Sequence, residues 1–389
     1  MAKWTPTKKQ LEEYNKKREE VLELSKSSIT DIFENYQTDI ETVLDYFIFA
    51  SKFYNYSPNN VALIQAQLPN STFVQSSGAW HSMGAVPKKG THGAKILVPQ
   101  KKKFIIADKD TVLKYQDLND KQKEKIISNP AEKVVIALSQ ACKEIKIMAK
   151  NGEFDTKEKL VYGLGSVFDI AQTTYPVEDY PKLFTVGIPD EKAHFMYNAI
   201  SSYINEKTPY SISEKEIDSI SLHGFFSPLT NQICINNILQ DSEKIKTMLH
   251  ELGHAFYHNL EAQKENNQSN VLPLRGATEM KEIQADIFAT LSLSMYDFEL
   301  PDSLKEHLKN NYTSLSNKLR GTKTDEQITK IIESSSTDVM KEFNKHAKAM
   351  NEYIEEYTLE QSQTIETTEE ISETIENYDE ESDEINMSF

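Results

Sequence analysis

The chain has 389 residues, enough for two domains, and its 38% hydrophobic content with 17 Phe and 18 Tyr excludes an intrinsically disordered protein. The polar amino-terminal segment and the lack of any run of about 18 apolar residues exclude a secretory signal and a membrane span, so we expect a cytoplasmic protein with no membrane partner. Two cysteines, with no CxxC pairing, exclude a cysteine-built zinc site. Any metal must therefore be bound by histidine and carboxylate.

The net charge of −17 is concentrated toward the carboxyl end. No Lys or Arg follows Lys348, and 13 acidic residues lie between Glu355 and Glu384. The rest of the chain is therefore only mildly acidic and can carry a basic face. Because residues 351–389 hold too little apolar material to fold, we predict a disordered acidic tail there.

The first 150 residues predict an α+β domain. Residues 7–50 have the pattern of two helices, the second amphipathic over 29–49, and a further helix is predicted at 61–67. Glycine and proline turns between short β-branched runs then predict strands, among them 94–98. The section 116–150 is charged and predicted to be helical.

A connector and a second α+β domain are predicted to follow. Residues 151–189 include the run from Val167 to Thr173 (VFDIAQT), which we expect to be an extended link between the domains. The second domain is predicted over residues 190–350. It should contain strands at 217–222 and 232–236 and helices at 242–261 and 278–296.

The motif H-E-x-x-H lies within the first of these two helices, as His250, Glu251 and His254. The i, i+4 spacing places both imidazoles on one face of a helix, where they can share a metal ion. Glu251, next to the first histidine, can then act as the general base toward water. One zinc ion per chain is the expected cofactor, because zinc activates water and polarises a carbonyl group.

A catalytic zinc site needs a third protein ligand. Glu279, Glu282 and Asp286 follow one another at i, i+3 and i+7 along the second helix, which places carboxylates along one face. We choose Glu282 as the ligand, with Glu279 as the alternative. Asp286 is then expected to accept a hydrogen bond from a ligand histidine and to fix its tautomer.

Three further side chains are candidates for contact with the substrate. His258 follows His254 by four residues, but a straight helix places it about 6 Å further along the axis, too far for a ligand. His258 or Tyr257 is instead a candidate for stabilising the oxyanion, and His223 is another. Strand 232–236 is expected to pair with an extended peptide substrate.

These motifs resemble the zincin metallopeptidases of the ImmA/IrrE type. The shared order is a strand, then H-E-L-G-H, then a helix with E-x-x-A-D-x-F-A, which here are residues 233–236, 250–254 and 282–289. The resemblance covers roughly residues 190 to 300. It implies a metal on His250, His254 and Glu282, with Glu251 as the base.

The amino-terminal domain is similar to that of ArdC-type antirestriction proteins and their LtrC-like relatives from mobile elements. The similarity rests on residues 56–67, Thr72, Trp80, 84–90, 95–99 and the segment 167–173. It implies binding of single-stranded DNA. Exposed lysines and aromatic rings suit such a role, because lysines follow a phosphate backbone and rings stack on unpaired bases. The candidates are Tyr54, Tyr56, Phe73, Trp80, Lys88, Lys89, Lys95 and Lys101 to Lys103.

The H-E-x-x-H motif predicts a zinc metallopeptidase with a protein substrate of unknown identity. The ArdC-type resemblance further implies a protein of a mobile genetic element that binds single-stranded DNA and protects incoming DNA. Two alternatives stay open. The first is a DNA-binding protective protein whose metal site is structural or inactive. The second is a peptidase that cleaves a transcriptional repressor.

Overall fold

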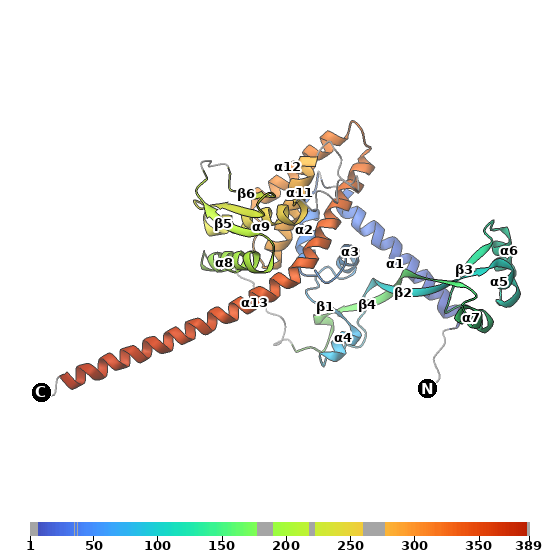
Figure 1. Ribbon diagram of the computed structural model, residues 1–389, viewed down its shortest axis with the longest axis horizontal. Coiled ribbons are helices and arrows are strands. Elements are labelled where there is room, and N and C mark those ends of the chain that lie inside the picture. The colour runs from blue at the N-terminus through green and yellow to red at the C-terminus, as the bar shows by residue number, and fades with distance from the viewer. Residues whose placement is uncertain are drawn as a thin grey trace.

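The computed structural model describes residues 7–34, 36, 38–176, 190–217, 222–259 and 277–386, and for residues 8, 190, 191 and 362–386 it describes the backbone alone. The chain is α+β, as expected (Figure 1). The helices are α1 (Lys8–Glu34), α2 (Ile40–Ser51), α3 (Pro58–Gln67), α4 (Ser77–Ser82), α5 (Lys109–Tyr115), α6 (Asp120–Ser128), α7 (Lys143–Lys150), α8 (Asp190–Lys207), α9 (Asp241–His258), α11 (Ala277–Met295), α12 (Asp302–Leu319) and α13 (Asp325–Asn386). The strands are β1 (Val74–Ser76), β2 (Ala94–Asp108), β3 (Lys133–Ala137), β4 (Asp155–Asp169), β5 (Ser211–Lys215), β6 (Gly224–Ser227) and β7 (Gln232–Asn236).

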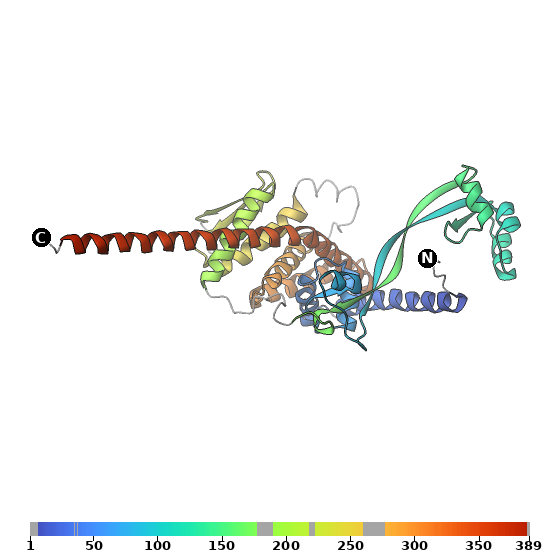
Figure 2. The same cartoon turned by 90° about the horizontal axis from the view of Figure 1, so that it is seen from below.

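The first sheet has the order β1-β4-β2-β3, and all of its pairings are antiparallel. Strands β2 and β4 form a long ribbon, paired from Ala94 with Val167 to Ile106 with Asp155. The ribbon extends away from the body of the molecule and carries β3, α5, α6 and α7 at its far end (Figure 2). These distal elements share a small core of their own, which includes Ile105, Val112 and Ile145.

Side chains from α1 and α3 cover the edges of the ribbon where it leaves the body. The amide of Asn60 forms hydrogen bonds with both the N–H and the carbonyl of Leu97, and the amide of Gln67 does the same at Lys95. On the other edge, the Tyr14 hydroxyl accepts a hydrogen bond from the N–H of Leu164. Unpaired strand edges are prone to unwanted association, so these contacts also protect the base of the ribbon.

The second sheet has the order β5-β7-β6, with β5 parallel and β6 antiparallel to the central strand β7. Ile233, Cys234, Ile235 and Asn236 of β7 are all buried, and α9 packs against β6 and β7. Helix α11 lies at the centre of the helical layer, where it contacts α9, α12, α13 and α2. The candidate site therefore lies between two of the most deeply packed helices.

One large hydrophobic core joins parts of the chain that the sequence analysis assigned to different domains. It includes Phe33 and Phe47 from α1 and α2, together with Leu249 from α9 and Phe288 from α11. The amino-terminal helices thus pack directly on the helices of the candidate site, and the division at residue 150 stays a prediction.

Several predicted elements differ from the observed ones. The helix break falls near residue 36, because α1 continues to Glu34 and Asp39 caps α2 by accepting a hydrogen bond from the N–H of Thr42. The section 116–150 includes strand β3. Most of the expected strand 217–222 lies outside the described residues, and β6 begins at Gly224.

The expected connector is largely a strand. Residues 155–169 form β4, which lies between β1 and β2, and residues Ile170–Gln172 form a short 3-10 helix. Asp169 caps that turn and also accepts hydrogen bonds from the N–H groups of Thr72 and Phe73. The apolar run is therefore buried within the first sheet and does not simply link two domains.

The disordered acidic tail stays a prediction, but its expected start at residue 351 falls within a packed part of helix α13. Helix α13 continues through this point to Asn386, and it extends beyond the body of the molecule (Figures 1 and 2). Ile354 is buried, and Tyr353 and Tyr357 pack against the large core. These three residues share one helical face, which the acid-rich composition of the tail concealed.

Candidate metal centre

Helix α9 presents the H-E-x-x-H motif. Its first turn carries Asp241 and Glu243, which suit the positive end of the helix dipole. Met248, Leu249 and Leu252 are fully buried on the face opposite the solvent. This apolar face fixes the rotation of the helix, so His250 and His254 point toward α11.

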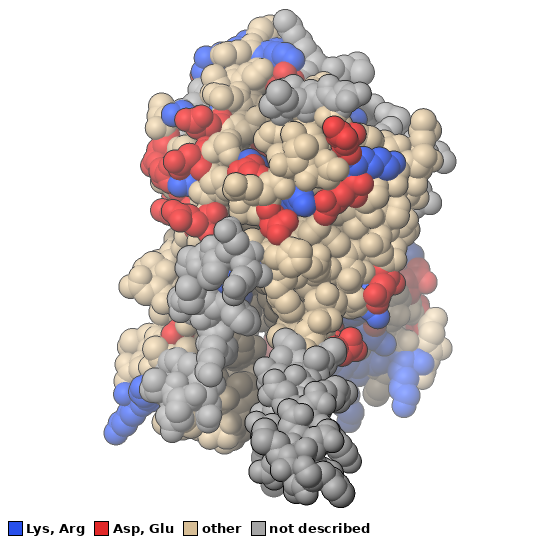
Figure 3. Space-filling model, turned by 90° about the vertical axis from the view of Figure 1, so that its left-hand side faces the viewer, with Lys and Arg blue, Asp and Glu red and all other residues tan. Residues whose placement is uncertain are grey.

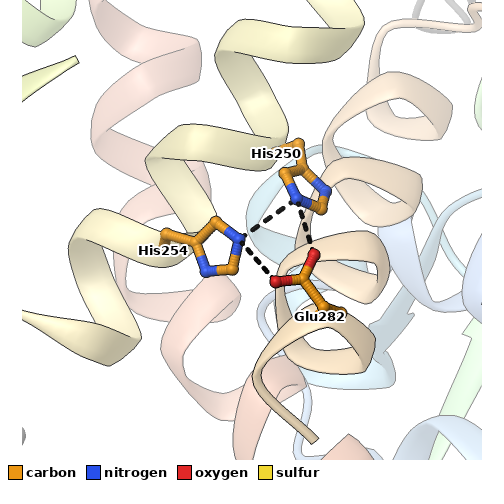
Figure 4. Close-up of side chains that lie close together, drawn as sticks. All are labelled: His250, His254 and Glu282. Atoms are coloured by element: carbon orange, nitrogen blue, oxygen red, sulfur yellow. Dashed lines mark hydrogen bonds and ion pairs between the residues drawn. The ribbon is translucent and has the colours of Figure 1, made fainter. Parts of the chain in front are cut away.

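Three side chains from two helices converge at this point (Figure 4). The Nε2 atoms of His250 and His254 lie 3.1 Å apart. The two carboxylate oxygens of Glu282, on α11, lie 3.5 Å from Nε2 of His250 and 3.7 Å from Nε2 of His254. Within the described residues, these three form the one group of His, Cys, Asp and Glu side chains whose ligand atoms all lie within 4.8 Å of one another.

The far sides of both imidazoles are occupied by other partners. Nδ1 of His250 lies 3.0 Å from Oδ1 of Asp286, and Nδ1 of His254 lies 2.8 Å from Nδ1 of His258. When each ring is neutral and carries its proton on Nδ1, the lone pair of each Nε2 is directed at Glu282. Two such nitrogens and a carboxylate form a donor set that fits a tetrahedral zinc site with one open position.

The charges of these groups are strongly coupled. Burial disfavours the charged imidazole of His250, but hydrogen bonds to Asp286 and Glu282 outweigh this effect and raise its pKa to about 10. The nearby imidazoles of His250 and His254 lower the pKa of Glu282 despite its partial burial. The carboxylate is therefore ionised and available to a cation.

Glu251 lies beside the three candidate ligands and is 8% exposed. Burial raises the pKa of its carboxyl group, while the nearby His250 and His254 act in the opposite direction. It lines a pocket of ≈ 380 Å³ together with His223 and His250. A carboxylate of raised pKa next to an accessible pocket is suited to general-base chemistry.

The expected role of Asp286 matches its position, whereas Glu279 lies away from the metal centre. Asp286 is fully buried and contacts His250 as described. Glu279 accepts hydrogen bonds from Ser314 and Lys318 on α12, and these lower its pKa. The geometry thus brings Glu282, rather than Glu279, to the two histidines.

Two of the three oxyanion candidates face away from the pocket. The hydroxyl of Tyr257 donates to the carbonyls of Asp338 and Val339 on α13. His258 is buried behind His254, and burial lowers its pKa to about 3. His223 does line the pocket.

Strand β7 is paired on both sides, so it cannot receive a peptide as a further strand, and β6 is the edge strand beside the pocket.

His307 was not identified from the sequence. It lies on α12 in the same pocket as Glu251, and its Nδ1 atom is 2.9 Å from Oδ2 of Asp286. One buried carboxylate therefore contacts a candidate ligand and a histidine of the pocket wall. No local motif marks His307, because it meets Asp286 only through the packing of α11 against α12.

The aromatic candidates for base stacking are mostly occupied within the fold. Trp80 is fully buried and its indole N–H donates to the carbonyl of Phe168, so its expected role in stacking was wrong. Phe73 packs against Trp80, and the hydroxyl of Tyr56 donates to the carbonyl of Val74. Tyr162, on β4, is 45% exposed and was not among the candidates.

The lysine candidates are exposed. Nζ of Lys88 donates to the carbonyl of Ala171, and Nζ of Lys95 donates to the hydroxyl of Ser166. Lys89 and residues 101–103 are exposed as well. On the face opposite the distal end of the ribbon, acidic and basic side chains are instead interspersed (Figure 3).

A known protein family matches the part of the chain that contains this site. Residues 211–315 match the IrrE N-terminal-like domain of peptidase family M78. The matched residues include β5, β6, β7, α9 and α11, and with them His250, His254 and Glu282. The resemblance inferred from the H-E-L-G-H segment is thus confirmed for this part of the chain.

The chain is also similar to other known proteins. An uncharacterized protein of Bacillus anthracis is 27% identical over 276 residues, which are 66% of this chain and 41% of that protein. This chain therefore spans less than half of the length of that relative. Crystal structures of the antirestriction protein ArdC from plasmid R388 align with 84% of this chain at 13% identity. The metal-free form has a TM-score of 0.41 over 98% of its chain, and the Mn(II)-bound form has 0.37 over 97%.

Among the described helices, none is both long and apolar enough to cross a lipid bilayer.

Proposed function

We propose that this protein is a zinc-dependent peptidase, with zinc held by His250, His254 and Glu282. The observation that carries the proposal is the convergence of these three side chains next to Glu251 and an open pocket. When bound, zinc supplies a Lewis acid that polarises a carbonyl group and makes water more acidic.

The residues of the chain have separate tasks in this proposal. Glu251 accepts the proton of the attacking water at a carboxylate oxygen. Asp286 holds His250 through its Nδ1 atom. His223 and His307 lie in the pocket wall, where they can donate hydrogen bonds to the oxygen of the scissile carbonyl as it becomes negative.

The edge strand β6 offers a place for the substrate backbone. Gly224 lines the pocket, and β6 is hydrogen-bonded only to β7 among the described strands. An extended peptide can therefore add to the free edge of β6 and pass Glu251. The chemical class of the substrate is an extended polypeptide segment.

A comparison of new protein amino termini in cells tests the peptidase proposal. Cells that express the full chain are compared by mass spectrometry with cells that express Glu251→Gln, and Glu41→Gln serves as a control because Glu41 is exposed on α2. We expect termini that are present with the wild-type chain and with Glu41→Gln but absent with Glu251→Gln. Identical termini in all three would contradict the peptidase proposal and favour a binding protein with a structural metal site.

We propose nucleic-acid binding as a second function, because charge is segregated along the chain. Residues 94–169, which form the β2–β4 ribbon and its distal elements, contain 15 lysines and 11 acidic residues, whereas the whole chain has 43 basic and 60 acidic residues. Single-stranded DNA is the proposed ligand, since the exposed lysines can follow phosphates and the ring of Tyr162 can stack on an unpaired base.

The salt dependence of DNA binding tests this second function. In the full chain, replacing Lys101, Lys102 and Lys157 with Gln should weaken binding to single-stranded DNA. It should also reduce the slope of log affinity against log salt by about 2, because about 0.7 counterions are released per phosphate contact. Gln at Lys341, Lys345 and Lys348 on α13 is the matched control. Binding that is absent at low salt, or equally altered by both triple variants, would contradict the proposal.

A role in protecting incoming DNA would join the two functions in one chain. DNA-stimulated cleavage of a protein that attacks DNA supports this role. Cleavage of a transcriptional repressor without any effect of DNA would favour the alternative of a regulatory peptidase.

A further inference from the structure

A buried histidine and a glutamine lie directly behind one of the candidate ligands. Nδ1 of His254 is 2.8 Å from Nδ1 of His258, and Nε2 of His258 is 2.9 Å from Oε1 of Gln284. His258 follows His254 by one turn of α9 and is 5% exposed, and Gln284 lies on α11. The three side chains thus form a hydrogen-bonded chain that leads away from the metal centre.

The donors and acceptors of this chain can be assigned from one end to the other. A metal ligand at Nε2 of His254 requires a lone pair there, so the proton of the neutral ring lies on Nδ1. This N–H donates to Nδ1 of His258, which must then be unprotonated. The proton of His258 therefore lies on Nε2 and donates to the side-chain oxygen of Gln284. The position of Oε1 of Gln284 agrees with this assignment.

We propose that His258 and Gln284 are positioning residues, which hold His254 in the tautomer and orientation that direct its Nε2 lone pair toward Glu282. This inference rests on the metal site of the proposed function. It assigns both residues a role that does not require contact with the substrate, in agreement with the burial of His258 behind its neighbour.

The two histidine ligands are held by chemically different groups. His250 is held by the carboxylate of Asp286, whereas His254 is held by an imidazole whose own partner is a neutral amide. A carboxylate partner makes an imidazole a more basic ligand. Replacing the amide of Gln284 with a carboxylate should therefore strengthen the hydrogen bonds that orient His254, while an apolar side chain should weaken them.

Zinc affinity of the full chain tests the proposal. The metal is removed with a chelator, and the dissociation constant is measured by competition with a chromophoric chelator. Loss of such a partner typically lowers metal affinity 10- to 100-fold, so we expect an increase of at least about 10-fold in the dissociation constant for His258→Leu. Gln284→Leu should raise the constant, and Gln284→Glu should leave it unchanged or lower it. His194→Leu, on the exposed surface of α8, is the matched control and should bind zinc as the wild-type chain does.

The absorption spectrum of bound Co²⁺ separates positioning from a merely structural role. Altered ligand geometry changes the visible bands of Co²⁺, so His258→Leu should change the spectrum and Gln284→Glu should keep it. The melting temperature of the metal-free chain identifies any variant that does not fold. If His258→Leu fails to fold, Gln284→Leu compared with Gln284→Glu decides the question.

Wild-type zinc affinity and an unchanged Co²⁺ spectrum in folded His258→Leu would overturn the proposal, as would equal effects of Leu and Glu at Gln284. Zinc binding is measured without hydrolysis, so the failure of the peptidase proposal alone leaves this inference standing. Failure of the wild-type chain to bind zinc would overturn both.

Discussion

At the scale of single residues, Asp286 joins the candidate metal centre to the pocket. Its carboxylate is fully buried, with one oxygen 3.0 Å from Nδ1 of His250 and the other 2.9 Å from Nδ1 of His307. Burial opposes its ionisation, but the two adjacent imidazoles outweigh this effect and lower its pKa. Uncompensated buried charge is costly, so both imidazoles help to keep this carboxylate ionised.

His307 is expected to assist turnover without holding the metal. Its hydrogen bond to Asp286 raises its pKa, so the ring keeps its second proton to a higher pH than an ordinary histidine and can donate from Nε2. Replacing His307 with Ala should lower kcat about 100-fold, the order found when one oxyanion donor is removed, with zinc content unchanged. Turnover that depends on the protonated ring should fall as pH rises through this raised pKa. A normal kcat in His307→Ala would contradict the assignment.

The two glutamates of α11 should give clearly different results in a metal assay. Glu282→Gln removes the carboxylate between the histidines, so zinc content should fall to near zero after dialysis. Glu279→Gln should keep zinc, because Glu279 binds Ser314 and Lys318 on α12. Measuring metal content in both variants checks the choice, and the reverse pattern would identify Glu279 as the ligand.

At this scale, residues within one helix were predictable and residues that meet by packing were not. The i, i+4 spacing of His250 and His254 fixes their common face, and the predicted ligand Glu282 lies close to both histidines. His307 lies on a third helix, and the burial of Trp80 depends on contacts with distant residues. Neither the position of His307 nor the burial of Trp80 can be predicted from the local sequence.

At the scale of elements, the site depends on the close approach of α9 and α11. Gly253 lies between the two candidate histidine ligands on α9, and a Cβ atom there would meet Cα of Ala285 at 3.0 Å and Cβ of Phe288 at 3.1 Å. The lack of a side chain at Gly253 thus permits the short distance between α9 and α11. The same distance places Glu282 beside His250 and His254.

Gly253→Ala is therefore expected to affect both stability and metal binding. The added methyl group must push α11 away, which costs roughly 1–3 kcal/mol of unfolding free energy, as overpacking of a core does. Moving Glu282 away from the histidines should also weaken zinc binding. Denaturant unfolding and zinc competition measure the two effects. Gly78→Ala on α4 is a control, because the added Cβ would come no closer than 4.0 Å to another residue. Unchanged zinc affinity in Gly253→Ala would show that the spacing is not critical.

Helices with a clear apolar period were predicted to within a few residues, whereas strand β3 was missed within a charged segment that was predicted to be helical. Helices expected at 242–261 and 278–296 correspond to α9 and α11, because both carry a strong buried face. Strand β3 lies in a segment whose charge favoured a helix, and its pairing with β2 over residues 104–108 decides its conformation. Tertiary pairing can override local propensity in this way.

At the scale of the whole molecule, the amino-terminal helices and the carboxyl-terminal helix both pack against the helices of the candidate metal centre. Helix α2 packs on α11, and Asn344 of α13 donates to the carbonyl of Tyr56. The ring of His346 stacks on Phe256 of α9, with centroids 3.7 Å apart. The sequence could not predict this shared core, because its contacts join residues hundreds of positions apart.

Two truncations should distinguish the packed part of α13 from its acidic extension. Removing residues after 348 deletes the buried side chains of Met350 and Ile354, each contributing roughly 2 kcal/mol, so the melting temperature should fall clearly. Removing residues after 361 should leave it close to that of the full chain, because the deleted segment has few apolar residues. Thermal unfolding followed by circular dichroism measures both. Equal melting temperatures for the two truncated chains would contradict the packing role of residues 349–361.

The most direct test of the metal centre is the zinc content of the purified full chain, measured by mass spectrometry of the elements after dialysis. We expect about one zinc per chain in the wild-type protein and in Glu251→Gln, since Glu251 is not a ligand. The double variant His250→Ala, His254→Ala should hold almost none, because one carboxylate cannot retain the ion alone. Full zinc content in the double variant would contradict the account.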